Sequence, residues 1–204
     1  MQHQHRRPTR RTAGLRAAAA AALAAVLALS ACSTAPELEK QARAGDNKNY
    51  VAGDGSVVEV AASDRGEPVE VTGTSAEGKP VDLTKWRGDV VVLNVWYAAC
   101  GPCRAEAPDL RDIANKYAAD GVRFVGVNTR DDAKTAQAFQ RRFEIPYPSI
   151  IDSDGAAIIA LRGQVSPQAV PTTLVIDKEG RVAARILGIA DPSVLRSLVD
   201  DALA

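Results

Sequence analysis

Two cysteines, Cys100 and Cys103, are separated only by a glycine and a proline. They stand where an apolar, strand-like run at Val90–Trp96 gives way to helical spacing at Arg104–Tyr117. The first thiol therefore lies at a helix N-terminus, where unpaired amide groups and the positive end of the helix dipole favour the nucleophilic thiolate. The pattern predicts thiol-disulfide exchange, with Cys100 as the exposed attacking thiolate and Cys103, one turn inward, as the resolving thiol.

The remaining metal-binding side chains do not favour a zinc site. The chain has a third cysteine, Cys32, in its N-terminal segment, and its two histidines are His3 and His5. A zinc site built on the Cys100–Cys103 pair would need two further ligands, and both histidines precede a predicted cleavage point. We therefore expect no metal and no cofactor apart from the redox-active Cys100–Cys103 disulfide.

Residues 1–31 have the pattern of a signal peptide. Five arginines are followed by thirteen apolar residues at Ala17–Leu29, a run too short for the roughly 20 residues of a membrane span. The sequence Leu29-Ser30-Ala31-Cys32 resembles a bacterial lipobox, which predicts cleavage before Cys32 and lipid attachment to it. Ordinary secretory cleavage, leaving Cys32 free, is the alternative. The expected location is the extracytoplasmic face of the bacterial cell membrane, held there by the lipid.

Cleavage would change the charge of the chain. The full sequence has 25 basic and 25 acidic side chains, and removal of the five arginines leaves a net charge of about −5, which argues against a nucleic-acid partner. Residues 32–49 are polar and alanine-rich and are predicted to form a flexible tether. Residues 50–204 have the length and apolar content of a single domain.

The elements around the cysteines alternate between strand and helix. The predicted strands are Val57–Val60, a hairpin of Val69–Val71 with Pro80–Leu83, then Val90–Trp96, Val122–Val127, Ser149–Asp152, Thr172–Ile176 and Val182–Ile186. The predicted helices are a turn at Thr84–Gly88, then Arg104–Tyr117, Ala133–Phe143, Ala156–Leu161 and a terminal helix from Asp191. This order predicts an α/β fold with a central mixed sheet flanked by helices.

Four segments carry a family resemblance: Asn94–Trp96, Cys100–Cys103, Arg104–Pro108 and Val170–Asp177. In order and spacing they resemble the TlpA/ResA-like family of extracytoplasmic thiol-disulfide oxidoreductases, from about residue 69 to the C-terminus. The resemblance implies a thioredoxin fold with an N-terminal β-hairpin extension.

The same resemblance implies that the Val170–Pro171 peptide bond is cis and lies beside the cysteines. Substrate would then bind along Val170, Pro171 and Thr172. The alternative interpretation of Pro171 is an ordinary proline at the first residue of a strand, where proline is tolerated.

Glu106 follows Cys103 by three residues and lies on the same face of the predicted helix, so its carboxylate can reach the region behind the thiol. The resemblance implies that this glutamate adjusts cysteine acidity, because cytoplasmic thioredoxins have an aspartate on the preceding strand where this chain has Asn94. The alternative is a solvated glutamate on the helix surface.

One residue departs from the family pattern. The family usually has tryptophan directly before the first cysteine, whereas this chain has Ala99, so an apolar docking surface is lost. Residues two apart in an extended backbone face the same side, and we hypothesise that Tyr97 refills part of that surface.

The resemblance implies a membrane-anchored reductase, expected to be monomeric, that acts on the disulfides of exported proteins. Apocytochrome c, during cytochrome c maturation, is a candidate substrate. Because the environment outside the cytoplasm is oxidising, electrons must come from a membrane donor of the CcdA or DsbD type.

Three other functions are alternatives to this one. A disulfide oxidase or isomerase uses the same motif, because direction depends on reduction potential. A peroxiredoxin needs a Pro-x-x-x-Thr-x-x-Cys loop, which Asn94–Cys100 does not supply. A Sco-type copper chaperone needs a histidine ligand, which the chain would lack after cleavage.

Overall fold

The computed structural model describes residues 55–204; the predicted signal peptide (1–31), Cys32 and the rest of the tether lie outside them. The strands are β1 (Val57–Glu59), β2 (Thr72–Thr74), β3 (Pro80–Asp82), β4 (Val90–Trp96), β5 (Val122–Asn128), β6 (Ser149–Ile151), β7 (Thr172–Ile176) and β8 (Val182–Leu187). The helices are the 3₁₀ turn η2 (Leu83–Trp86), α3 (Gly101–Lys116), α4 (Ala133–Phe143), α5 (Ala156–Ala160) and α6 (Pro192–Leu203). None of these helices has the length and apolarity needed to cross a membrane.

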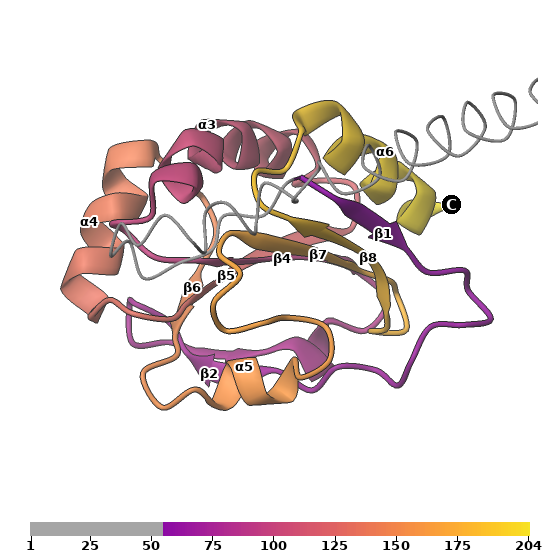
Figure 1. Ribbon diagram of the computed structural model, residues 1–204, viewed down its shortest axis with the longest axis horizontal. Coiled ribbons are helices and arrows are strands. Elements are labelled where there is room, and N and C mark those ends of the chain that lie inside the picture. The colour runs from indigo at the N-terminus through magenta and orange to yellow at the C-terminus, as the bar shows by residue number, and fades with distance from the viewer. Residues whose placement is uncertain (1–54) are drawn as a thin grey trace, which may run out of the picture. The chain divides into compact units, whose positions relative to one another are not determined.

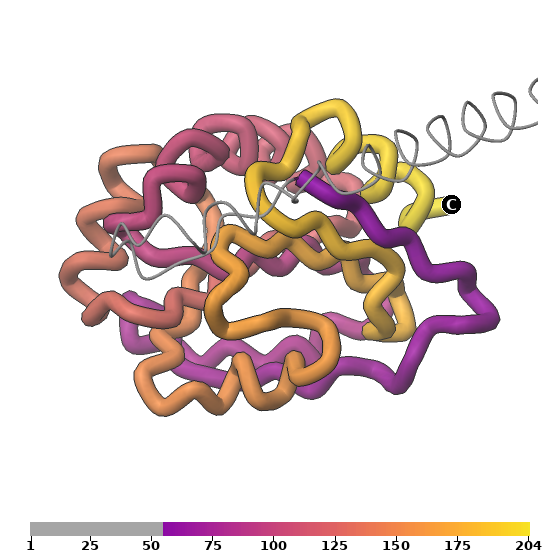
Figure 2. The backbone as a smooth tube through the Cα atoms, viewed as in Figure 1, coloured from indigo at the N-terminus to yellow at the C-terminus, as the bar shows by residue number. Residues whose placement is uncertain are grey.

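Six strands form one mixed sheet in the order β1-β8-β7-β4-β5-β6 (Figure 1). Strands β4, β5 and β6 run parallel, whereas β7 is antiparallel to both β4 and β8. The backbone tube in Figure 2 shows the first described segment beside the C-terminal part of the chain, where β1 pairs with β8. The expected α/β class with a mixed sheet is confirmed.

Both faces of this sheet are covered by packed elements. Side chains of α3 and α6 pack on one face, where Leu110 and Leu195 share a core with Val92. The hairpin and α5 pack on the other face, where Val81 and Ile158 belong to a second core. Because both faces are covered, every residue of β4 is buried. This explains its unbroken apolar sequence.

The predicted hairpin is present, but its first strand was placed three residues too early. Thr72–Thr74 pairs with Pro80–Asp82, and the turn between them is closed by the Ser75 N–H donating to the Lys79 carbonyl at 2.8 Å. This turn places Thr74 opposite Pro80 and thereby sets the register. Val69 and Val71, which were predicted to form the first strand, precede it and are buried in the core, and the Val71 carbonyl still accepts the Leu83 N–H at 3.0 Å.

The chain reaches its cysteines at the end of β4. Helix α3 begins at Gly101 with Cys100 as its N-cap, so the first thiol lies at a helix N-terminus as expected, and the helix includes three residues before the helical spacing noted from Arg104. Pro102 stands in the first turn, where proline is favoured. Strand β7 pairs with β4 so that Thr172 lies opposite Val95. The segment before β7 is thereby brought next to the start of α3.

Candidate active site

Cys100 and Cys103 form a disulfide across the first turn of α3, with their Cα atoms 5.3 Å apart. This separation lies within the usual range for a disulfide, so the turn can hold both thiols at bonding distance. The Sγ atom of Cys100 also accepts the backbone N–H of Cys103 at 3.2 Å. The N-terminal amide that was expected to favour a thiolate therefore points at the Cys100 sulfur.

Both sulfurs are buried in this disulfide state. Cys100 is 0% exposed and Cys103 is 2% exposed, so the expectation of an exposed Cys100 is wrong here. The Cys100 Sγ is bonded to Cys103 and lies 4.0 Å from the carbonyl oxygen of Val170. An incoming thiolate must therefore displace neighbouring atoms before it reaches the disulfide.

The segment before β7 forms one wall of the site. The Val170–Pro171 peptide bond is cis, as the family resemblance implied, and the Val170 carbonyl oxygen is the atom that approaches Cys100. Thr172 is buried, and its hydroxyl donates to the Ala169 carbonyl at 2.6 Å. The structure thus brings Val170 and Pro171 to the cysteines and turns the Thr172 hydroxyl back onto its own loop. Their part in substrate binding stays a prediction.

Glu106 lies one helical turn beyond Cys103 and is 1% exposed, which rules out a solvated surface glutamate. Its Oε1 accepts the side-chain amide of Asn94 at 2.8 Å, and its Oε2 accepts the backbone N–H of Ala190 at 3.0 Å. Burial raises the pKa of Glu106 to about 7, against the lowering effect of these two hydrogen bonds. A group that changes charge near neutral pH is therefore buried close to Cys103.

Two residues of this hydrogen-bond network, Thr173 and Ala190, were not predicted from the sequence. The Asn94 amide also contacts the Thr173 hydroxyl at 3.1 Å, because β4 and β7 place these residues opposite each other. The second of the two threonines that begin β7 was the available signal. Ala190 acts through its backbone N–H, which its residue type does not reveal.

Tyr97 does not replace the missing docking surface. Its side chain is 4% exposed, and the Arg130 guanidinium lies 4.4 Å from its ring centroid. Ala99, by contrast, is exposed. The hypothesis that Tyr97 offers an apolar surface to a partner is wrong, because its ring packs inward and is covered. The exposed side chain before Cys100 is a single methyl group.

A carboxylate holds the loop that leads to Cys100. Asp131 Oδ2 accepts the backbone N–H of Ala98 at 2.6 Å and the side-chain amide of Asn128 at 2.8 Å. The Asn128 Oδ1 in turn accepts the N–H groups of Arg130 and Asp131. The loop after β5 is thus fastened to the loop after β4. The sequence did not indicate this contact, because its partners are 33 residues apart.

Replacing Asp131 by asparagine is expected to lower the free energy of unfolding by about 1–3 kcal/mol, because a charge-assisted hydrogen bond to a backbone N–H is lost. Urea unfolding of the oxidised protein measures this change. Asp201→Asn, an exposed acid on α6, serves as the control and should change the free energy by less than about 0.5 kcal/mol. Equal stability of both variants would show that Asp131 does not hold the loop.

Comparison with known proteins agrees with this geometry. A family model described as Redoxin matches residues 40–203. A thiol-disulfide oxidoreductase ResA of Bacillus cereus is 32% identical over 115 residues, which make up 56% of this chain and 64% of that protein. The chain thus covers slightly less than two thirds of this relative's length.

Solved structures show the same architecture. A DsbF homologue from Corynebacterium diphtheriae is 32% identical, with a TM-score of 0.64 over 73% of this chain and 94% of its own. A secreted thiol-disulfide isomerase from Corynebacterium glutamicum is also 32% identical, with a TM-score of 0.62 over 73% and 95% of the two chains. The similarity to ResA agrees with the expected TlpA/ResA-like resemblance. The fold is the thioredoxin fold, and the chain belongs to the Redoxin family.

Proposed function

We propose that this protein is a thiol-disulfide oxidoreductase that reduces disulfides of exported proteins through the Cys100–Cys103 dithiol, without a further cofactor. The observation that carries the proposal is a disulfide at the N-terminus of α3, facing a cis-proline loop and backed by a buried glutamate. The ResA relative, which is named as a thiol-disulfide oxidoreductase, supports the same reaction.

The proposed reaction transfers two electrons in two exchanges. The Cys100 thiolate attacks a substrate disulfide, forms a mixed disulfide and releases one substrate sulfur as a thiolate, which takes a proton from solvent. Cys103 then loses its proton and attacks the Cys100 sulfur, so that the second substrate sulfur leaves and the Cys100–Cys103 disulfide forms. In this scheme Glu106 accepts the proton of Cys103, because its carboxylate is buried one turn away with a pKa raised to about 7.

The proposed setting is the extracytoplasmic face of the membrane, with a lipid on Cys32 as the anchor. A solved relative from Corynebacterium glutamicum is described as secreted, which supports export. We further propose a monomer without nucleic-acid partners, supplied with electrons by a membrane donor of the CcdA or DsbD type. Apocytochrome c is a candidate substrate. Mass spectrometry of the mature N-terminal peptide tests the anchor, and a peptide without lipid mass would remove it.

A disulfide oxidase or isomerase is the second candidate function. One observation favours it: two solved relatives are described as a DsbF homologue and as a thiol-disulfide isomerase. Both functions use the same dithiol and differ in the reduction potential of the pair. The potential therefore decides between them.

Reduction of a protein disulfide tests the reaction itself. The protein, a disulfide-bonded substrate protein and dithiothreitol are mixed, and release of substrate thiols is followed with no cofactor added. We expect the release to be faster than with dithiothreitol alone. A rate equal to that background would contradict the proposed reaction in either direction.

A further inference from the structure

The proposed exchange requires protons to reach two side chains that have almost no contact with solvent. Cys103 is 2% exposed and Glu106 is 1% exposed. Cys103 is bonded to Cys100, and Cys100 is itself 0% exposed in the disulfide, so solvent does not reach Cys103 from the side where substrate would bind. Protons that enter or leave behind Cys103 therefore need another route.

A small cavity lies behind Cys103. Its volume is about 10 Å³, which is close to the room that one water molecule needs. Its wall includes Cys103 itself and three residues with polar side chains that can bond a water: Asn94, Tyr147 and Ser149. Asn94 is also the residue that donates to the Glu106 carboxylate. The cavity therefore adjoins both the resolving thiol and the partner of the buried acid.

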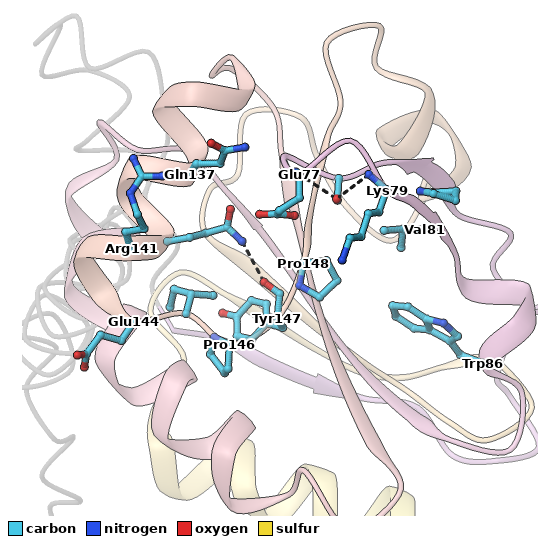
Figure 3. A pocket seen from close by; sticks show the side chains of 14 residues that line it. Glu77, Lys79, Val81, Trp86, Gln137, Arg141, Glu144, Pro146, Tyr147 and Pro148 are labelled. Carbon is cyan, nitrogen blue, oxygen red and sulfur yellow. Dashed lines mark hydrogen bonds between the residues drawn. The ribbon is translucent and has the colours of Figure 1, made fainter.

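A much larger groove opens on the other side of the same wall. It has a volume of about 910 Å³ and lies between the hairpin, the end of α4 and the segment before β6 (Figure 3). Ile145 and Tyr147 line both the groove and the small cavity. In Figure 3, Tyr147 lies in the groove between Pro146 and Pro148. These two side chains thus separate the cavity behind Cys103 from the groove.

We propose that the Tyr147 hydroxyl relays protons between water in this groove and the cavity behind Cys103; the inference rests on the proposed dithiol-disulfide exchange. A tyrosine hydroxyl can donate and accept a hydrogen bond at once, whereas Ile145 can do neither. The Tyr147 ring packs against Phe124, with ring centroids 5.5 Å apart. Burial, and secondly the charge of Glu106, raise the pKa of Tyr147, so its hydroxyl stays protonated between turnovers.

The relay acts when the Cys100–Cys103 disulfide is reduced by a dithiol. A thiolate of the dithiol attacks the Cys100 sulfur, the Cys100–Cys103 bond breaks, and Cys103 leaves as a thiolate that takes the proton held by Glu106. Tyr147 passes a replacement proton inward from the groove. The second thiol of the dithiol then loses its proton, attacks the mixed disulfide and releases Cys100 as a thiolate, so that two electrons have moved.

The test compares Tyr147→Phe with the matched variant Tyr117→Phe. The Tyr117 hydroxyl bonds Asp200 at 2.7 Å, and its ring packs in the core between the sheet and α6. Reduction by dithiothreitol is followed by stopped-flow tryptophan fluorescence, because Trp96 lines the cavity. We expect Tyr147→Phe to slow reduction severalfold and to increase the rate ratio between H₂O and D₂O, while the reduction potential stays unchanged. Tyr117→Phe should change none of these quantities.

A second variant keeps the test independent of any folding defect. Ile145→Ala removes part of the wall, admits water from the groove, and is expected to speed proton exchange and lower the H₂O/D₂O ratio. The relay is overturned if Tyr147→Phe matches the wild type in both rate and isotope ratio, or if Ile145→Ala leaves both unchanged. If the wild-type disulfide is not reduced by dithiothreitol at all, the proposed exchange fails, which is a different result from failure of the relay alone.

Discussion

Replacing Cys103 by serine is expected to trap substrates on Cys100 as stable mixed disulfides, and replacing Cys100 by serine is expected to lower substrate reduction by at least about a thousandfold. In the first variant the thiol that completes the exchange is missing, so the reaction stops after the first attack. In the second variant the nucleophile itself is missing, and Cys103 lies within the first turn of α3, whereas Cys100 is its N-cap. Non-reducing gels and thiol release measure the two results.

The third cysteine requires a control, because Cys32 can also form disulfides. Peptide mapping of the trapped species distinguishes Cys100 from Cys32, and the double variant Cys100→Ser/Cys103→Ser should trap nothing. Mixed disulfides that form on Cys103 in the Cys100→Ser variant as readily as on Cys100 would reverse the assigned roles.

Replacing Glu106 by glutamine is expected to remove a pH dependence of stability that the wild type shows between about pH 4.5 and 7. The pKa of Glu106 is raised from 4.5 to about 7 by burial, so the folded protein holds a proton that the unfolded chain releases in this window. The stabilising contribution is full below pH 4.5 and is lost as pH rises through 7. A shift of roughly 2.5 units corresponds to about 3 kcal/mol.

Urea unfolding of the oxidised proteins at several pH values measures this effect. Glu106→Gln leaves one of two donors, the Asn94 amide or the Ala190 N–H, without its carboxylate acceptor, which lowers stability by the same amount at every pH. The informative quantity is therefore the change with pH in the difference from wild type. Glu70→Gln, an exposed acid, should track the wild type. A difference that stays constant from pH 4.5 to 7 would contradict the raised pKa.

The same substitution tests the proton-handling role in the reduced protein. If Glu106 accepts the proton of Cys103, Glu106→Gln should alter the pH dependence of Cys100 alkylation. The carboxylate and both thiols lie within the first two turns of α3, so the charge of one affects the protonation of the others. An unchanged profile would leave Glu106 as a buried structural acid.

Elements with strong local patterns could be predicted from the sequence. Strand β4 and helix α4 have their predicted bounds, because an unbroken apolar run and a helical period define them locally. The helix N-terminus at Cys100 was predicted, whereas the capping of α3 by the Cys100 sulfur was not, because it is a property of the folded turn. The first hairpin strand was placed too early because the turn at Ser75–Lys79, rather than the valines at 69 and 71, decides which residues pair.

In the candidate site, too, the features set by local sequence were predicted and those set by long-range contacts were not. The Cys100–Cys103 pair and Glu106 lie on one helix, so their spacing was sufficient to predict that they lie together. The contacts of Asn94 with Thr173 and of Asp131 with Ala98 join segments that are distant in the sequence. The pairing of β4 with β7 creates the first, and the pairing of β4 with β5 brings together the loops that form the second. The exposure of Cys100 was mispredicted, because it depends on the Val170 loop and not on the helix that carries the thiol.

The reduction potential of the Cys100–Cys103 pair tests the central claim most directly. The protein is equilibrated with glutathione buffers of known ratio, and its oxidised fraction is determined by alkylation of free thiols. A reductase is expected to have a potential near that of thioredoxin, about −270 mV, because it must hold its electrons less tightly than its substrates do. A value near that of DsbA, about −120 mV, would contradict the reductase and assign the protein to disulfide formation.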